Sequence, residues 1–573
     1  MLRGRHVSFR FLDMQSARRV YALASGAATR WARSEYHAGI GGDGSFMTRR
    51  VEVRFEGGAP VGVAEGATLL DAARVARVAI DAACAGLGTC GRCRVRVRGE
   101  LSAPAAEEVA ALGAAAVADG WRLACRARAL GAVTVEVPLP GTLAVVEGAA
   151  LEPAWKPDPD AEPGTLGVAL DVGTTTVVAA LVDLRSGDAL ATASALNAQH
   201  PWGADVMSRV AAAQRGEGEA LHRALVEQAD ALIVELAQAA APDADRIARI
   251  AAVGNTAMRG LLLGHDVTPL GAAPYEGVPL EAVTTTWRAV GGARVTDADL
   301  YALPCVSAFV GADAIAGLVA ARLDSASDPR LFVDLGTNAE VVLWTGDRWL
   351  AASAAAGPAL EGAGLSCGMR AVPGAIEAAT LEEGDLRLET MGGVEPTGLC
   401  GSGALSLAAA LLDAGILDAS GRMRESAGRL GSRVVERDGQ RAFVLDESGA
   451  LLFTQKDVRA VQLAKGAVRA AIELLLAEAG LAAHDVAEVL VAGGFGRRLE
   501  SEALARTGTL PGVWRDRLRF VGNAALEGAR AALVSSTARA EAERLARRIV
   551  TLDLASDPRF QRRFMEALDF PRQ

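Results

Sequence analysis

The stretch Asp171-Val-Gly-Thr-Thr-Thr176 closes the apolar run Leu166–Asp171, and a similar stretch, Asp334-Leu-Gly-Thr-Asn-Ala339, closes Leu331–Asp334. The two aspartates lie 163 residues apart, at positions 171 and 334, and each stretch leads into a second apolar strand, a turn and a third strand. A repeated order of strand, D-x-G-T, strand, turn and strand predicts a duplicated α/β domain with pseudo-twofold halves.

The D-x-G-T turn is chemically suited to hold a phosphate. Its glycine lets the hairpin backbone approach the oxygens, and the hydroxyl and N–H groups that follow can donate to them. An aspartate at the end of a strand can hold Mg²⁺ through water. One such turn alone would be an ordinary hairpin, but two in matching contexts favour a nucleotide site. The candidate Mg²⁺ residues are Asp171 and Asp334, and the candidate phosphate residues are Gly173, Thr174, Thr175, Gly336, Thr337 and Asn338.

Two further features complete the predicted site. Glu340 follows the second turn and is a candidate for orienting water, although an edge-strand role is equally open. The buried strand predicted at Glu488–Ala492 enters a glycine-rich turn, which would let a flat adenosine lie against the backbone; its residues are Gly493, Gly494, Phe495 and Gly496. Two phosphate turns followed by an adenosine turn resemble the superfamily of acetate and sugar kinases, Hsp70 and actin. That resemblance implies two RNase H-like lobes around Mg-ATP. No G-x-x-x-x-G-K-[ST] occurs, which excludes a P-loop NTPase.

The N-terminal part of the chain is predicted to form a small β-rich domain. Arg49–Phe55, Arg92–Arg98 and Ala132–Pro138 alternate between apolar and polar residues, as half-buried strands do. Between the first two, Thr68–Val78 has the apolar spacing of a helix.

Four cysteines of this domain, Cys84, Cys90, Cys93 and Cys125, are spaced C-x5-C-x2-C and then one distant Cys. Four thiolates in such a pattern are what a [2Fe–2S] cluster requires, and the glycines among them allow a tight loop. A structural zinc site and inert thiols remain alternatives, although zinc usually takes two close C-x-x-C pairs. The pattern resembles ferredoxins of the plant or adrenodoxin type, closer to the latter. This implies a β-grasp fold and a low-potential electron carrier, about −400 mV in plant-type relatives.

Composition excludes several classes of protein. The 573 residues are 51% hydrophobic and 22% charged, which is too apolar for a disordered chain. No run of about 18 apolar residues occurs, so no membrane-spanning helix is expected. The net charge of −10 provides no global basic field for nucleic acid. Sparse cysteines outside the cluster pattern fit a reducing, cytoplasmic location.

The expected organisation has five parts. Residues 1–46 form a disordered leader or an over-extended start, 47–138 the ferredoxin-type domain, and 139–165 a proline-rich linker. The ATPase domain follows at 166–535, with lobes of about 166–325 and 326–535, and 536–573 form a helical C-terminal tail. A homodimer is possible.

A ferredoxin placed ahead of an actin-like ATPase resembles the reductive activators of corrinoid-dependent methyltransferases and demethylases. Further stretches similar to that family are Asn197–Arg209, Gly254–Met258, Leu303–Asp313, Gly357–Gly364, Cys400–Ala404 and Thr454–Ala467. The resemblance implies an ATP-hydrolysing redox activator that passes one electron from its [2Fe–2S] cluster to a Co(II) corrinoid and restores Co(I). It also implies Mg²⁺, a corrinoid protein partner and an electron-donating reductase. The alternatives are an electron donor to another low-potential enzyme and a small-molecule kinase with an accessory ferredoxin domain.

Overall fold

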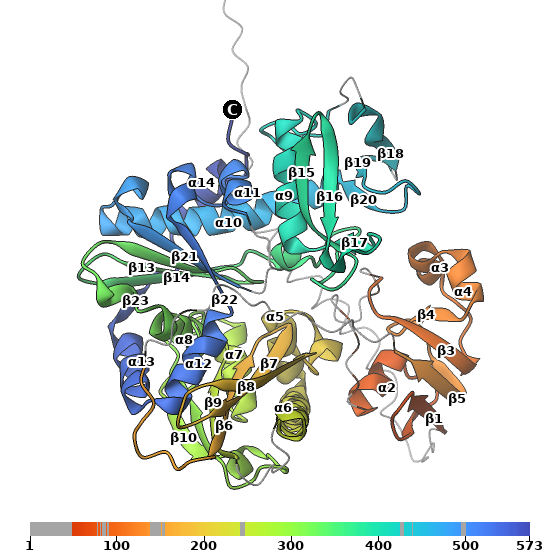
Figure 1. The fold of residues 1–573 in the computed structure, drawn as a ribbon. Helices are drawn as coiled ribbons and strands as arrows, with labels where there is room; N and C mark the ends of the chain where they lie inside the picture. Colours follow the sequence, from red (N-terminus) through yellow and green to blue (C-terminus); the bar gives the residue numbers. More distant parts are fainter. Residues whose placement is uncertain are drawn as a thin grey trace, which may run out of the picture. The chain divides into compact units, whose positions relative to one another are not determined.

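The fold is an α/β multidomain one, as the sequence predicts, with two large sheets and a smaller ferredoxin sheet (Figure 1). The computed structural model describes residues 49–76, 78, 80, 82, 88, 91–137, 151, 155–240, 247–424, 429–437, 439–493 and 500–572. The leader predicted at residues 1–46 and most of the linker predicted at 139–165 lie outside these residues.

The ferredoxin sheet has the mixed order of a β-grasp fold, β2-β1-β5-β3-β4. β1 pairs with β5 in parallel, and the other neighbours pair antiparallel. The apolar residues of β1 and β5 alternate inward and join the buried face of α2 in one core. The elements are β1 (Arg50–Phe55), β2 (Val61–Ala64), α2 (Leu69–Ala76), β3 (Arg94–Leu101), α3 (Ala106–Leu112), α4 (Ala114–Ala118), β4 (Trp121–Leu123) and β5 (Ala129–Glu136).

The first lobe contains a six-stranded sheet of order β10-β11-β9-β6-β7-β8. β6, β7 and β8 form an antiparallel meander, and β9 and then β11 continue the sheet parallel to β6. The strands are β6 (Leu166–Val172), β7 (Thr176–Asp183), β8 (Ala189–Leu196), β9 (Ile247–Val253), β10 (Val283–Thr286) and β11 (Asp299–Ala302). The helices are α5 (Val206–Ala212), α6 (Gly218–Ala240), α7 (Thr256–Leu262) and α8 (Ala312–Ala321).

The second lobe repeats this topology. β12, β13 and β14 form the meander, β21 and β22 continue it in parallel, and β23 adds an edge strand beside β14. The elements are β12 (Arg330–Asp334), β13 (Ala339–Trp344), β14 (Trp349–Ala354), α9 (Gly401–Asp413), α10 (Gln455–Ala479), β21 (Glu488–Ala492), α11 (Ser501–Arg506), β22 (Leu518–Gly522), α12 (Ala524–Val534), α13 (Ser536–Arg548), β23 (Ile549–Thr551) and α14 (Pro558–Glu566). Two small sheets are inserted, made of β15 (Ala375–Glu382), β16 (Asp385–Thr390) and β17 (Gly398–Leu399), and of β18 (Val434–Arg437), β19 (Gln440–Val444) and β20 (Leu452–Thr454).

One hydrophobic core joins the two lobes. Apolar side chains of α8 and α12 pack together with one face of each large sheet, such as Ala169 of the first and Phe332 of the second. Gly528 of α12 allows close contact, because a Cβ there would lie 1.9 Å from the carbonyl oxygen of Ala316. The strand ends that carry the two D-x-G-T turns are therefore held against a shared, packed element.

The C-terminal segment differs from the expected tail. Residues 536–573 belong to the second lobe: β23 pairs in parallel with β14, and α13 buries Ala542 and Leu545 in the shared core. Phe570 is 2% exposed and packs on the far side of the second sheet. The charged, amphipathic pattern of this segment is that of a helix with one buried face, and sequence alone did not show which surface it covers.

We expect Phe570→Ala to destabilise the second lobe by about 3–5 kcal/mol, because it removes a fully buried aromatic ring near the chain end. Lys465 Nζ also lies 5.1 Å from the centre of this ring. The matched control is Met565→Ala, since Met565 lies in the same segment but is 65% exposed. Denaturant unfolding followed by circular dichroism tests this: equal loss of stability in both variants would contradict the docked C-terminus.

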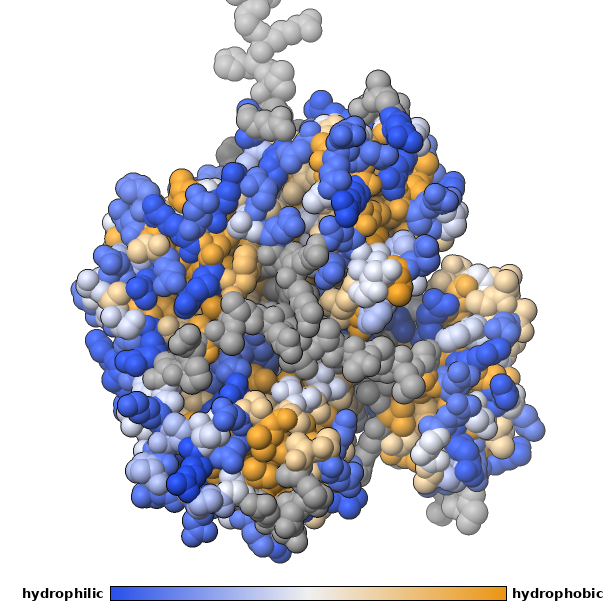
Figure 2. Space-filling model, in the orientation of Figure 1, coloured by the Kyte–Doolittle hydropathy of each residue, from blue (hydrophilic) through white to orange (hydrophobic). Residues whose placement is uncertain are grey.

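Hydrophilic side chains cover most of the face shown in Figure 2, with smaller hydrophobic patches among them. Within the described part of the chain, none of the helices combines the length and the apolar character needed to span a bilayer.

Candidate functional site

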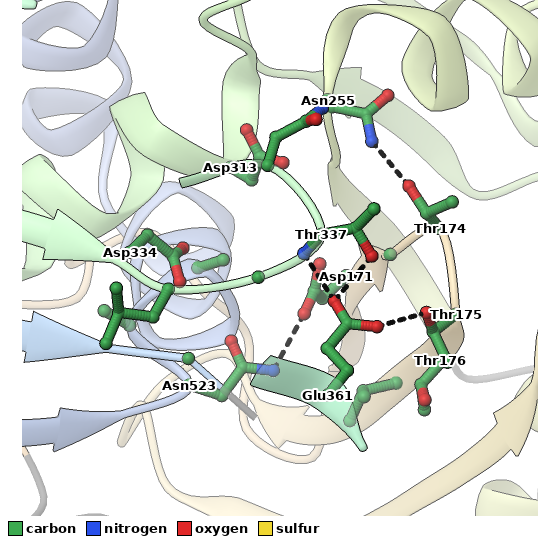
Figure 3. A pocket seen from close by; sticks show the side chains of 18 of the residues that line it. Asp171, Thr174, Thr175, Thr176, Asn255, Asp313, Asp334, Thr337, Glu361 and Asn523 are labelled. Carbon is green, nitrogen blue, oxygen red and sulfur yellow. Dashed lines mark hydrogen bonds between the residues drawn. The ribbon is translucent and has the colours of Figure 1, made fainter. Parts of the chain in front are cut away.

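A pocket lies where the central strands of both lobes end (Figure 3). Asp171 is the penultimate residue of β6, and Asp334 is the last residue of β12. The pocket brings together both D-x-G-T turns and the start of the predicted adenosine turn; the predicted residues that line it are Asp171, Gly173, Thr174, Thr175, Asp334, Gly336, Thr337, Asn338, Glu340 and Gly493. Gly494, Phe495 and Gly496 lie outside the described residues.

The first turn requires glycine at its predicted position, and the second has little space for any other residue. A Cβ at Gly173 would lie 2.6 Å from the carbonyl oxygen of Thr176, which is closer than real Cβ contacts allow. At Gly336 a Cβ would come within 3.1 Å of the carbonyl oxygen of Asn338. In both turns the absence of a side chain lets the backbone fold closely on itself.

The first turn is held by two residues of the family-like stretches Asn197–Arg209 and Gly254–Met258, for which the sequence predicted no role. Asn255 caps α7, and its Nδ2 donates a 2.9 Å hydrogen bond to Thr174 Oγ1. Arg209 is fully buried and donates to the carbonyl oxygen of Thr174 and, at 3.0 Å, to Gln199 Oε1. Asn255 comes shortly after β9, which pairs in parallel with β6, and Gly493 comes directly after β21, which pairs in parallel with β12. The internal repeat therefore includes the residues that follow these two strands.

Three aspartates line the pocket wall. Burial raises the pKa of Asp171 to about 7, with a further rise from the charge of Asp313 and an opposing effect of a hydrogen bond from Asn523. Burial, Asp313 and Asp171 likewise raise the pKa of Asp334 to about 7. Burial raises that of Asp313, at the start of α8, to about 6. Carboxylates whose ionisation is opposed in this way are stabilised in the charged form by a cation.

Asn523 joins the two lobes at the pocket. It follows β22 in the second lobe and caps α12, and its Oδ1 accepts from the N–H of Leu526 at 2.9 Å. Its Nδ2 donates a 2.8 Å hydrogen bond to Asp171 Oδ2 in the first lobe (Figure 3). The Asp171 carboxylate is therefore oriented by a residue 352 positions later in the chain.

Glu340 lies in β13 beside Asp334 and is 8% exposed. Burial, then the charges of Asp313 and Asp334, raise its pKa well above the ordinary range, and Ser353 Oγ donates to its Oε1 at 3.0 Å. Glu340 therefore lies on an interior strand, between β12 and β14, and not on an edge strand, and its side chain also lines the pocket.

The pocket fits a cation that keeps part of its water shell. Among the residues that the structure describes, no three His, Cys, Asp or Glu side chains converge as a complete metal cage. Mg²⁺ usually keeps several waters and takes one or two carboxylates together with phosphate oxygens. Asp171 and Asp334 at the strand ends supply such carboxylates, beside two turns rich in donors.

Sequence reasoning missed Asn255, Asp313, Glu361, Arg370 and Asn523 among the residues that line the pocket. A signal existed for two of them, because Asn255 and Asn523 both directly follow a glycine at the end of a parallel strand. Ligand sites of α/β sheets lie outside the carboxyl ends of such strands. Asp313 and Glu361 lie in segments that resemble the family but reach the pocket only through tertiary packing.

Two of the four predicted cluster ligands lie side by side in the ferredoxin domain. Arg94 pairs with Leu123, which places Cys93 and Cys125 at the same end of β3 and β4. Their Sγ atoms are 3.3 Å apart, well beyond a disulfide bond of about 2.05 Å. Both side chains are buried. Cys84 and Cys90 lie outside the described residues.

Two described glycines before Cys93 have backbone angles that suit a tight turn. Gly88 has φ +77° and Gly91 φ +66°, a region that glycine adopts without strain. A Cβ at Gly88 would lie 2.2 Å from Arg126 Nε, so the guanidinium group next to Cys125 rests on this loop. A cation at this place favours thiolates, the form in which cysteine binds iron.

Three family models match successive parts of the chain. Residues 57–130 match the 2Fe-2S iron-sulfur cluster binding domain. Residues 166–326 match the RACo middle region, and 328–573 match the C-terminal domain of RACo, the ASKHA domain. The last match extends through β23 and α14, in line with a C-terminal segment that is part of the second lobe.

Two named relatives and one solved structure match large parts of the chain. The corrinoid activation enzyme RamQ of Eubacterium limosum is 34% identical over 424 residues, which cover 71% of both chains. The [Co(II) methylated amine-specific corrinoid protein] reductase of Methanosarcina barkeri is 27% identical over 396 residues, covering 64% of this chain and 69% of the relative. A solved structure, titled reductive activator for corrinoid,iron-sulfur protein, is 28% identical with a TM-score of 0.67, covering 91% of this chain and 98% of that one.

Proposed function

The chain belongs to the RACo family of corrinoid reductive activators, and on that premise we propose that it uses ATP to return a Co(II) corrinoid to Co(I). One observation carries this function: a single chain holds both a ferredoxin domain and a pocket between two lobes. In the ferredoxin domain Cys93 and Cys125 lie side by side, and the pocket contains two D-x-G-T turns. When bound, the [2Fe–2S] cluster supplies one low-potential electron, and the corrinoid cobalt receives it.

The residues of the pocket have distinct proposed roles. Thr174, Thr175, Thr337 and Asn338 donate to the phosphates of ATP, with the backbone exposed at Gly173 and Gly336. Asp171 and Asp334 hold Mg²⁺, and Asn523 keeps the first of them oriented. The turn that begins at Gly493 holds adenosine. The four cluster ligands are Cys84, Cys90, Cys93 and Cys125, of which the pair at 93 and 125 lies close together.

Nucleotide binding is needed because the electron transfer is uphill. Each 100 mV of unfavourable potential costs one electron about 2.3 kcal/mol, so a donor some 100–200 mV too positive needs about 2–5 kcal/mol. A ligand that binds one of two conformers more tightly supplies coupling energy of this order. We propose that the two lobes, which Asn523 and a common core join, are the element whose arrangement ATP shifts.

The proposed partner is the corrinoid protein of a methyltransferase or demethylase system. The names of two relatives point to a methylated-amine-specific corrinoid protein in one case and a corrinoid,iron-sulfur protein in the other. Both names contain a corrinoid but differ in the protein that carries it. The corrinoid is therefore the part of the substrate that the two relatives share. A separate reductase refills the cluster between turnovers.

The function is tested with the full chain, its cluster reconstituted and reduced anaerobically, mixed with a Co(II) corrinoid protein. Cobalt(I) is followed by its visible absorption with and without Mg-ATP. We expect Co(I) to accumulate with ATP and hardly at all without it. Equal Co(I) formation under both conditions, with a normally reducible cluster, would overturn the coupling. ATP turnover that responds to small hydroxylated acceptors but not to the corrinoid protein would indicate a kinase instead.

Binding of Mg-ADP near pH 7 is expected to release protons. In the nucleotide-free protein Asp171 and Asp334 have pKa values raised from 3.8 to about 7. The native state then holds protons that the unfolded chain has lost, so these two groups lower stability as the pH rises from about 4 to about 7. Mg²⁺ favours the ionised form and reverses that loss. Calorimetry in two buffers of different ionisation enthalpy measures the released protons; no release near pH 7 would contradict a cation beside these carboxylates.

A further inference from the structure

The carboxylate of Glu361 occupies both phosphate turns at once (Figure 3). Its Oε1 accepts hydrogen bonds from the N–H of Thr337 at 2.7 Å and from Thr337 Oγ1 at 3.0 Å. Its Oε2 accepts from Thr175 Oγ1 in the other lobe at 2.8 Å. One side chain of the second lobe, at the end of the 3₁₀ turn Pro358–Glu361, thus joins the two D-x-G-T turns.

These contacts are the ones that a phosphate group would make. The N–H and hydroxyl donors converge on a pair of anionic oxygens, which is the arrangement of charge-assisted hydrogen bonding to phosphate. Each hydroxyl has a single hydrogen to donate, so it cannot serve the carboxylate and a phosphate oxygen together. The carboxylate also lies against the second turn itself, since a Cβ at Gly336 would be 3.4 Å from Glu361 Oε1.

We propose that Glu361 is an internal competitor of the nucleotide phosphates. In the nucleotide-free protein it satisfies the donors of both turns and links the lobes through Thr175. A phosphate must displace it before the turns can bind nucleotide. This inference rests on the proposed function, because only nucleotide binding in this pocket gives the carboxylate something to compete with.

The backbone around Glu361 is tightly packed. The carbonyl oxygen of the preceding residue, Leu360, would lie 1.7 Å from a Cβ at Gly401, so the 3₁₀ turn rests directly on the first residue of α9. Gly362 follows with φ +72° and would bring a Cβ to 2.1 Å from the carbonyl oxygen of Met369. The backbone on both sides of Glu361 is therefore closely packed against its neighbours. Arg370, which follows Met369, also lines the pocket.

The test measures Mg-ADP binding by titration calorimetry in the full chain. Glu361→Gln keeps the size and an acceptor oxygen but removes the negative charge. We expect it to bind Mg-ADP about tenfold more tightly, which corresponds to about 1.4 kcal/mol. Glu361→Asp is one methylene shorter and cannot reach both turns, so it is expected to bind more tightly as well, by a smaller factor. Glu447→Gln, at an exposed loop position, removes the same charge and should leave the affinity unchanged.

The outcomes separate this inference from the proposed function. If the unchanged protein binds Mg-ADP and Glu361→Gln binds it equally or more weakly, the competition is overturned, and weaker binding would mean that the carboxylate assists the ligand. If neither protein binds Mg-ADP, the proposed function itself fails. Thermal melting without nucleotide verifies that each variant is folded, and if Glu361→Gln is not, Glu361→Asp decides the question.

Discussion

Cys93→Ser is expected to lower ATP-dependent Co(I) formation to background while leaving nucleotide binding intact. Iron–sulfur clusters are held by cysteine thiolates, and a serine hydroxyl remains largely protonated near neutral pH. Cys93 is 1% exposed and lies 3.3 Å from Cys125, so no other described thiol can replace it without a rearrangement of β3 and β4. Visible absorption of the reconstituted protein measures the cluster, and the Co(I) band measures transfer.

The same substitution elsewhere is the control. Cys367→Ser changes a half-buried thiol of the second lobe, far in sequence from the four predicted ligands. It should leave cluster absorption and Co(I) formation unchanged. A Cys93→Ser protein that keeps a normal cluster and full transfer would exclude this cysteine as a ligand. Loss of Mg-ADP binding in that variant would show instead that the substitution disturbs more than the ferredoxin domain.

The repeated part of the fold could be predicted from the sequence because its signals are local. Apolar strands that end in D-x-G-T predict β6 and β12 to within a residue or two, and the same signals place Asp171 and Asp334 at one pocket. Alternation likewise predicts β1 and β5. Boundaries are less certain: the helix expected within Thr68–Val78 spans Leu69–Ala76.

The remaining residues of the pocket depend on contacts between distant segments. Asn523 meets Asp171 only when β22 joins the second sheet and α12 packs between the lobes. Glu361 reaches Thr175 across the lobes in the same way. No periodicity or short motif in the sequence predicts such contacts. The C-terminal segment could not be placed for the same reason. Its amphipathic pattern predicts a buried face, but it does not predict that β23 pairs with β14.

Asp171→Asn is expected to weaken Mg-dependent nucleotide binding by about 10- to 100-fold, the range seen when a group that orients a metal's ligands is lost. The amide has the shape of the carboxyl group but cannot become negative when Mg²⁺ arrives. Without nucleotide, the substitution should not lower stability. Burial opposes ionisation of Asp171 and raises its pKa to about 7. Above that pH the variant should therefore melt no lower than the unchanged protein.

This pair of effects distinguishes loss of a cation ligand from simple damage. Calorimetry of Mg-ADP binding and thermal melting without nucleotide measure the two quantities. Asp188→Asn, in an exposed turn of the same lobe, should change neither. If Asp171→Asn lowers both affinity and melting temperature, its hydrogen bond with Asn523 is mainly structural, and Asp334 remains as the candidate Mg²⁺ residue. If affinity is unchanged, Mg²⁺ is held without Asp171, and the symmetry of the two D-x-G-T turns does not extend to their function.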